Sequence, residues 1–274
     1  MTDLGSTAPM ETFTAADDLA LLTAAAHEAG RIALGFFGAA PEVWMKTGNS
    51  PVSEADFAVD AYLKRVLLAA RPTYGWLSEE TETVLGAAGA ERFFVVDPID
   101  GTRSFLRGES TWCVSVAVID AKRPHAGVID APAKGEVFTA VSGGEALLNG
   151  APIRVAPAGG GILSVAVPDG MVKRFEPERA AGHLAFAKAA PSLAYRLAEI
   201  AAGRFDGTVI RPNANDWDIA AGDLILELAG GSLVDLSGAA RLYDISGRKH
   251  GLLVAAAEHA LSRLTSMAEA SSPA

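Results

Sequence analysis

The chain has 274 residues, of which 50% are hydrophobic and 20% are charged, and its formal net charge is −10 at pH 7. This balance excludes a disordered or fibrous protein and favours one large compact domain. A net negative chain with scattered Lys and Arg residues also argues against a nucleic-acid polymer as partner.

The single cysteine, Cys113, excludes an intramolecular disulfide and favours a reducing compartment. No stretch of sequence approaches the roughly 18 apolar residues of a membrane span. Residues 1–14 are polar and lack the basic and apolar regions of a secretory leader. We therefore expect a cytoplasmic protein that has no membrane partner.

The N-terminal part of the chain carries two helix signals. Apolar residues recur at helical spacing over 19–37 and Gly38 follows, which predicts a long amphipathic helix with a glycine stop. Ser53 is expected to cap a second helix that runs to about Ala70. Its hydroxyl and the acids that follow it, among them Asp56, suit the free N–H groups of a first helical turn.

Extended and helical patterns alternate over the rest of the chain. Apolar runs predict strands at 93–97, 112–119, 125–130, 137–141, 162–167 and 252–256. Apolar residues at helical spacing predict helices at 178–188, 193–202, 216–228 and 258–268. This order predicts an α/β fold of stacked layers in a single domain over 1–274, with an N-terminal half of about 15–150 and a C-terminal half of about 151–270.

The richest candidate site is a hexapeptide, Asp97-Pro98-Ile99-Asp100-Gly101-Thr102, which leaves the end of an apolar strand. Pro98 fixes its own φ and Gly101 permits a tight backbone path, so both aspartates can converge on one point. With the Ile99 carbonyl between them, they offer the oxygen ligands that suit a hard cation such as Mg²⁺. Taken alone, Asp-Pro and Asp-Gly are also ordinary turn dipeptides.

Two further acidic positions support this site. Glu79, followed by Glu80, comes after the apolar run 74–77 and is expected at another strand end. Asp218 stands at the start of an apolar helix. Taken singly, Glu79 is more simply a solvated turn residue, and Asp218 is more simply an acid that stabilises a helix N-terminus.

In their order along the chain, these motifs resemble a known signature. Glu79-Glu80, the hexapeptide and Trp217-Asp218 together resemble the signature of the inositol monophosphatase family of lithium-sensitive, Mg²⁺-dependent phosphatases. Residues 51–56 resemble the upstream acidic motif of that family. The resemblance covers nearly the whole chain and implies an αβαβα sandwich of the inositol monophosphatase and fructose bisphosphatase type. It also implies a homodimer.

The resemblance implies a role for each motif residue. Two or three Mg²⁺ ions would be held by Glu79, Asp97, the Ile99 carbonyl, Asp100 and Asp218. Asp56 and Thr102 would orient and deprotonate the attacking water, and Gly101 and Thr102 would offer backbone donors to the phosphate. Glu80 is expected to stand behind the ligands, and Lys46 resembles a basic residue upstream of the water-activating motif.

The substrate is less determined than the reaction. Arg211 lies seven residues before Asp218, where inositol phosphatases that resemble this chain carry a glutamate. An arginine there prefers an additional anionic group, and Arg103 adds to that preference. We therefore expect an inositol-type monophosphatase that hydrolyses a small phosphorylated metabolite. The alternative is a 3′(2′),5′-bisphosphate nucleotidase or a histidinol-phosphatase. A non-catalytic regulator on the same fold is the alternative of another class.

Other catalytic chemistries find no support in the sequence. The five histidines show no H-E-x-x-H spacing, so a zinc site is not expected. No G-x-S-x-G segment occurs, and Ser110, Thr111 and Cys113 have no obvious partner base. The sequence therefore disfavours a hydrolase that forms a covalent intermediate.

Overall fold

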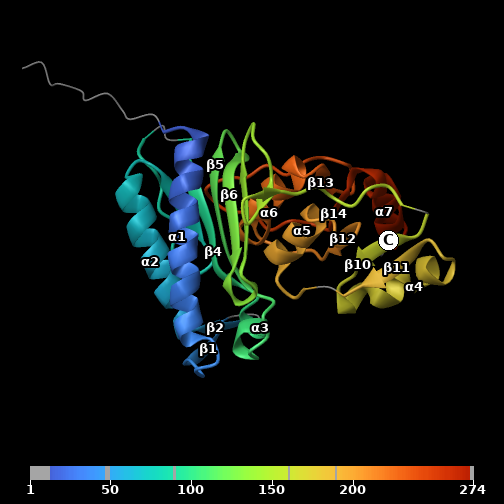
Figure 1. Cartoon of the computed structure of the whole chain (residues 1–274), viewed down its shortest axis with the longest axis horizontal. Helices are drawn as coiled ribbons and strands as arrows, with labels where there is room; N and C mark the ends of the chain where they lie inside the picture. Colours follow the sequence, from blue (N-terminus) through green and yellow to red (C-terminus); the bar gives the residue numbers. More distant parts are fainter. Residues whose placement is uncertain (1–12, 47–49, 89–90, 160, 189, 272–274) are drawn as a thin grey trace, which may run out of the picture.

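The computed structural model of the chain describes residues 13–46, 50–88, 91–159, 161–188 and 190–271. Figure 1 shows two β-sheets side by side, with helices on the outer side of each sheet and further helices between them. The layers therefore run α, β, α, β, α, which confirms the layered α/β fold predicted from the sequence. The sequence predicts no leader in residues 1–14. Of these, residues 1–12 lie outside the described residues.

The first sheet has seven strands. In spatial order they are β3 (Gly75–Ser78), β4 (Phe93–Asp100), β5 (Cys113–Asp120), β6 (Arg123–Ala131), β7 (Glu136–Val141), β8 (Leu147–Leu148) and β9 (Ala151–Pro152). β3 runs parallel to β4, and the other neighbouring pairs are antiparallel. Because neighbouring parallel strands end at the same edge of a sheet, the acidic segments at the ends of β3 and β4 emerge side by side.

Helices α1 (Ala15–Phe36) and α2 (Glu54–Ala70) cover the outer face of this sheet (Figure 1), where α1 contacts β6 and α2 contacts β4. Both predicted helices are present. α1 begins earlier than the apolar spacing indicated because Thr14 caps it, with the Asp17 backbone N–H donating to Thr14 Oγ1.

The second sheet has five strands, in the spatial order β11 (Leu184–Ala187), β10 (Leu163–Ala166), β12 (Gly207–Ile210), β14 (Leu253–Ala257) and β13 (Gly231–Asp235). α7 (Glu258–Ala270) packs on β12 and β14, and α4 (Val172–Ala180) lies beside β11. The two remaining long helices, α5 (Leu193–Ala201) and α6 (Asp216–Leu228), fill the layer between the sheets.

The buried surface of α6 explains why its sequence is apolar on more than one side. α6 contacts β6 of the first sheet and β13 of the second, and most of its residues are buried. Gly127 of β6 permits this close approach, since a Cβ atom at that position would lie 3.2 Å from the Cα of Ala221.

One predicted helix is wrong. The pattern at 178–188 does not form a helix, because α4 ends at Ala180 and the chain then enters β11. Gly182 has a φ of 76°, a left-handed conformation that ends helices and that glycine adopts at little cost. Leu184 is then buried beside Leu163 in the parallel pairing of β11 with β10.

Several short elements complete the fold. β1 (Val43–Lys46) and β2 (Ser50–Ser53) form an antiparallel pair, and α3 (Thr102–Leu106) follows β4 directly. Single 3₁₀ turns are η1 (Pro132–Lys134) and η2 (Asp169–Met171). Within the described ranges, no helix is both long and apolar enough to cross a membrane.

Candidate active site

The predicted metal ligands share one cavity of about 500 Å³ at the carboxyl ends of β3 and β4. Its walls include all five predicted ligands, Glu79, Asp97, Ile99, Asp100 and Asp218, together with the predicted substrate-binding residues Gly101, Thr102 and Arg211. Residues that are far apart in the sequence therefore face the same space. Asp56 and Glu80 do not line the cavity.

A break in the β4 pairing brings the two aspartates of the hexapeptide together. Side chains three residues apart on a regular strand point to opposite faces. In β4, the register against β5 shifts between Asp97, which pairs with Ser115, and Asp100, which pairs with Cys113. The strand therefore continues to Asp100, and the prediction that it ends at Asp97 is wrong. Pro98 contributes to the break because it has no N–H to donate to the ladder.

The start of α5 holds Asp100 in place. Its Oδ2 accepts hydrogen bonds from Ser192 Oγ at 2.7 Å and from the Ala194 backbone N–H at 2.6 Å. Burial raises the pKa of Asp100 to about 6, and these hydrogen bonds oppose the rise. Ser192 also caps α5 by accepting from the Tyr195 N–H, so the same hydroxyl orders the helix and orients the carboxylate.

Asp97 is a buried carboxylate with few hydrogen bonds to offset the loss of hydration. Its side chain is 1% exposed, and its Oδ1 has no hydrogen-bond donor among the residues the structure describes. Burial, reinforced by the charges of Glu79 and Asp100, raises its pKa well above the usual value. An orphaned buried carboxylate oxygen that faces other acids is a position where a cation would fit.

Asp218 supplies an acid to the cavity from α6. It lies in the first turn of α6, and its Oδ2 accepts from the Asn215 backbone N–H at 2.6 Å. Burial, and then the nearby Asp100 charge, raise its pKa to about 8. Asp218 therefore both stabilises the start of α6 and lines the cavity.

Lys46 provides positive charge at this acidic cluster. Its Nζ lies 3.0 Å from Glu79 Oε1 and 2.5 Å from Glu80 Oε1. Among the described residues, no three acidic, His or Cys side chains stand close enough together to form a ready ion-binding group. The chemistry of the donor set, which consists of carboxylates and one carbonyl, nevertheless fits a hard divalent cation.

The predicted water-activating pair is in contact. Thr102 Oγ1 lies 3.2 Å from Asp56 Oδ1 and 3.1 Å from the Ile99 carbonyl oxygen, and it can donate to either. Asp56 is 1% exposed, and its Oδ2 accepts from the N–H and the hydroxyl of Ser53 at the start of α2. Burial raises its pKa. Asp56 thus lies behind Thr102, and its carboxylate meets the cavity through that hydroxyl.

Glu80, which the sequence predicts to stand behind the metal ligands, has its side chain buried outside the cavity wall and contacts Lys46. Its side chain is 2% exposed, and burial raises its pKa to about 7, although the hydrogen bond from Lys46 opposes the rise. Arg103 also lines the cavity, at its α3 side. Sequence reasoning missed Arg196, a buried residue of α5 that lines the same space. Its signal was a charged residue within the apolar helix over 193–202.

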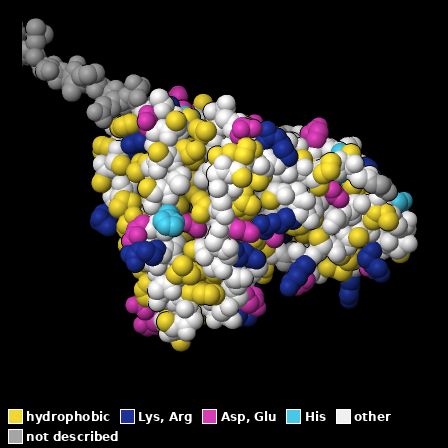
Figure 2. Space-filling model, viewed as in Figure 1, with side chains coloured by type: hydrophobic (Ala, Val, Ile, Leu, Met, Phe, Trp, Pro, Cys, Tyr) yellow, Lys and Arg dark blue, Asp and Glu magenta, His cyan; other side chains and the backbone are white. Residues whose placement is uncertain are grey.

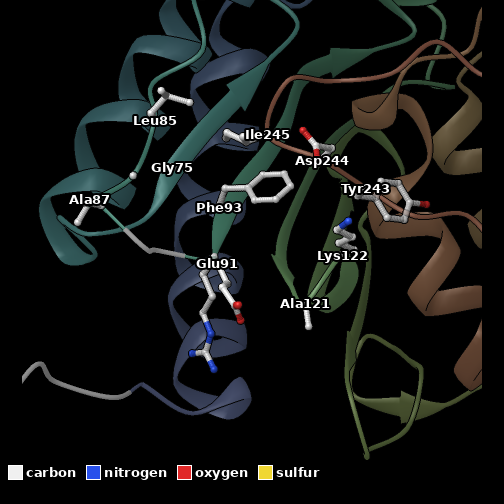
Figure 3. Close-up of a pocket in the computed structure, with 13 residues that line it drawn as sticks. Gly75, Leu85, Ala87, Glu91, Phe93, Ala121, Lys122, Tyr243, Asp244 and Ile245 are labelled. Carbon is white, nitrogen blue, oxygen red and sulfur yellow. The ribbon is translucent and has the colours of Figure 1, made fainter.

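A second and larger cavity lies at the other end of β4. Figure 3 shows Phe93, the first residue of β4, beside Ile245 in this cavity of about 610 Å³, which Leu85 also lines. Since a strand rises about 3.3 Å per residue, the two cavities lie about 20 Å apart. The Asp244 carboxylate accepts hydrogen bonds from Ser246, which lower its pKa, rather than meeting other acids. The larger cavity therefore does not share the chemistry of the acidic one.

Comparisons with known proteins agree with this geometry. The sequence model of the inositol monophosphatase family matches residues 14–272. An inositol-1-monophosphatase from Rhizobium meliloti (strain 1021) is 35% identical over 221 residues, which cover 76% of this chain and 82% of the relative. A Nus factor SuhB from Xylella fastidiosa is 32% identical over 239 residues, which cover 80% of this chain and 82% of the relative.

A solved structure shares the fold. The extragenic suppressor protein suhB from Bartonella henselae superposes with a TM-score of 0.80 at 30% sequence identity, over 91% of this chain and 97% of that structure. The family match extends over nearly the whole chain and includes every residue of the acidic cavity. These findings together show that this chain belongs to the inositol monophosphatase family.

Proposed function

We propose that this protein hydrolyses a small phosphate monoester by attack of a metal-activated water. The observation that carries the proposal is the convergence of Glu79, Asp97, Asp100 and Asp218 on one cavity, with Asp97 Oδ1 left without a donor among the described residues. Membership of a family that is generally metal-dependent and includes inositol-1-monophosphatases supports it. Oxygen ligands of this kind favour Mg²⁺.

The acidic residues would form the metal site. Glu79, Asp97, Asp100 and Asp218 would hold the metal with the Ile99 carbonyl, and Glu80 would hold Lys46 away from solvent behind them. When bound, Mg²⁺ lowers the pKa of a water and stabilises negative charge on phosphate oxygens. Burial is the main cause of the raised pKa of Asp97, and binding of a cation would relieve the repulsion from neighbouring acids that adds to it.

Thr102 and Asp56 would prepare the attacking water. With its hydroxyl proton directed at Asp56 Oδ1, Thr102 Oγ1 presents a lone pair to the cavity and can accept a hydrogen bond from a water there. Asp56 keeps that hydroxyl oriented, and its carboxylate can accept the proton that passes through it. The Ser53 hydrogen bonds hold Asp56 in position on its other side.

Gly101 would bring the backbone close to the phosphate. It has a φ of 95°, and a Cβ atom there would lie 3.0 Å from the Thr111 carbonyl oxygen. Both observations favour glycine at this position. The N–H groups of Gly101 and Thr102 at this tight bend are the proposed donors to the phosphate oxygens.

A non-catalytic regulator is the second candidate, because three relatives are named Nus factor SuhB. On the face shown in Figure 2, among the described residues, Lys and Arg side chains are interspersed with Asp and Glu and form no continuous basic band. That mixed surface gives no support to binding a nucleic-acid polymer through this face. The complete set of cavity acids favours the enzyme.

The test is release of inorganic phosphate from myo-inositol 1-phosphate, 3′-phosphoadenosine 5′-phosphate, histidinol phosphate and fructose 1,6-bisphosphate, with Mg²⁺ or with EDTA. We expect release that requires Mg²⁺ and is lost in Asp97→Asn. Asp244→Asn, which changes an acid of the other cavity, is the matched control and should retain activity. Absence of turnover on the whole panel with Mg²⁺ would reject the enzyme in favour of the regulator.

Two further properties belong to this proposal. The family resemblance supports a homodimer, which light scattering of the purified protein would test. It also supports inhibition by lithium, which the same phosphate-release assay measures.

A further inference from the structure

Arg196 is a buried cation on the wall of the acidic cavity. Arg196 belongs to α5 and is 8% exposed. The other buried residues of this helix are almost all apolar, so a charged residue among them is unusual. Nε and Nη2 both donate to the Ala190 carbonyl oxygen, at 2.9 and 2.6 Å. Within the described ranges, no carboxylate lies within 4.0 Å of this guanidinium.

A buried charge without an ion-pair partner is costly, and proteins seldom keep one that has no use. Burial lowers the pKa of Arg196, and the Asp100 and Glu199 charges oppose this effect only from a distance. A guanidinium carries five N–H donors, of which the Ala190 carbonyl accepts two. No acceptor among the described residues takes the remaining donors, and the side chain lines the cavity, so these donors can face a bound anion.

Arg211 stands beside Arg196 on the same wall. It follows β12, and its Nη1 would lie 3.3 Å from a Cβ atom placed on Gly170, so its guanidinium rests against the η2 turn. Side chains of both arginines also line a smaller adjoining cavity of about 230 Å³. That cavity includes Asp218 but not Glu79, Asp97 or Asp100.

The two arginines therefore extend the site away from the acidic centre. In the proposed reaction, the phosphate that is cleaved would lie at the Gly101 bend, beside the cation that Asp97 and Asp100 would hold, and the adjoining cavity would offer room for the rest of the substrate. Arg107, which also lines the main cavity, is already paired with Glu109 through an Nε to Oε1 distance of 2.8 Å. Its charge is thus largely compensated, unlike that of Arg196.

We propose that Arg196 and Arg211 form an anion-binding subsite, so that the substrate is a phosphate monoester carrying a second anionic group, either a carboxylate or a second phosphate. The planar fork of a guanidinium matches both anions through paired hydrogen bonds. This inference rests on the proposed phosphatase function and narrows its substrate. It disfavours histidinol phosphate, whose second charged group is an ammonium, and gives no advantage to the neutral ring of an inositol monophosphate.

The test compares substrates that differ only in the second anion. Glycerol 3-phosphate is matched with 3-phosphoglycerate for a carboxylate, and fructose 1-phosphate with fructose 1,6-bisphosphate for a phosphate. We expect kcat/KM to be at least ~10-fold higher for one of the two anionic members, since charge-assisted pairs with arginine are strong. The pair that shows this preference identifies the anion.

The variants assign the preference to the subsite. Arg196→Gln and Arg211→Gln should each lower kcat/KM for the anionic member, mainly through KM, and leave its neutral match within about twofold. Arg196→Lys should restore part of the preference. Arg107→Gln, on the same cavity but outside the subsite, should leave the preference intact. Equal loss on both members of a pair, or no preference in the wild-type protein, would overturn the proposal.

A binding measurement separates failure of this proposal from failure of the phosphatase assignment. Calorimetry compares propane-1,3-bisphosphonate with propylphosphonate, neither of which is hydrolysed. Tighter binding of the bisphosphonate that is lost in Arg211→Gln would support the subsite even if no substrate is turned over. Equal affinity for the two phosphonates would reject the subsite while leaving the phosphatase function standing.

Discussion

Three helices of this protein begin with the same hydrogen bond, but the aspartates that accept it have different surroundings. In α1, α2 and α6, an aspartate of the first turn accepts from the backbone N–H of the residue before the helix. The pairs are Asp17 with Thr14, Asp56 with Ser53 and Asp218 with Asn215. Asp17 is exposed, whereas Asp56 is buried and Asp218 lines the acidic cavity.

The electrostatics of these aspartates diverge accordingly. The hydrogen bonds from Thr14 lower the pKa of Asp17. Burial raises the pKa of Asp56 and raises that of Asp218 to about 8, despite the same kind of backbone hydrogen bond. The local motif therefore accounts for the start of each helix, and tertiary packing decides whether the acid is also available for chemistry.

The largest expected effect comes from Asp218→Asn. The amide oxygen can still accept from the Asn215 N–H, so the start of α6 is retained, but a proposed metal ligand is lost. We expect kcat/KM for the best substrate to fall at least ~100-fold. Thermal unfolding in EDTA should be nearly unchanged, because the variant also removes a carboxylate that other acids repel. Activity within threefold of wild type would show that Asp218 has only the structural role.

The next effect concerns the hydroxyl between Asp56 and the cavity. Thr102→Val removes the hydroxyl with little change of shape, and we expect kcat to fall by about 10- to 100-fold with a small change in KM. Thr102→Ser keeps the hydroxyl and is the matched control. If steady-state kinetics give the same loss for Val and Ser, the hydroxyl does not orient the water.

Thr14→Ala tests the exposed helix start, that of α1, where the aspartate is expected to have only a structural role. Loss of the Thr14 cap should lower the free energy of unfolding by about 1 kcal/mol, as measured by urea denaturation. kcat/KM should be unchanged, since α1 contributes no residue to the acidic cavity. A loss of activity at a temperature where the variant is fully folded would mean that α1 influences the site.

The smallest expected effect is a pH dependence at Asp17. Because its pKa is lowered in the folded protein, its ionised form stabilises the fold above the unfolded carboxyl pKa of about 4. That stabilisation is lost as the pH falls through the lower, folded pKa. The difference in Tm between the wild-type protein and Asp17→Asn should therefore close as the pH is lowered from 5 toward about 2. A Tm difference that is constant over this range would contradict the assignment.

Helix starts and the acidic motif were predictable from the sequence because their causes are local. Ser53 with Asp56 specifies the start of α2, and the predicted bounds of α6 agree with the structure. Spacing alone did not reveal that the pairing of β4 shifts beyond Asp97, since that break depends on the register of β5.

Other features depend on partners that are distant in the sequence. The segment 184–187 becomes a strand because β10 pairs with it, although its alanines equally suit a helix. The hairpin of β1 and β2 is short and largely exposed, so it carries little hydrophobic pattern. Arg196 gained its significance only when α5 was packed against the acidic cavity.

The most direct test of the central claim is calorimetric titration of Mg²⁺ into the wild-type protein and into Asp97→Asn, with Asp244→Asn as control. The wild-type protein and Asp244→Asn should bind Mg²⁺ equally. Asp97→Asn should lose binding, because a neutral amide replaces the buried carboxylate whose Oδ1 has no donor among the described residues. Equal binding of Mg²⁺ by Asp97→Asn and the wild-type protein would contradict the account.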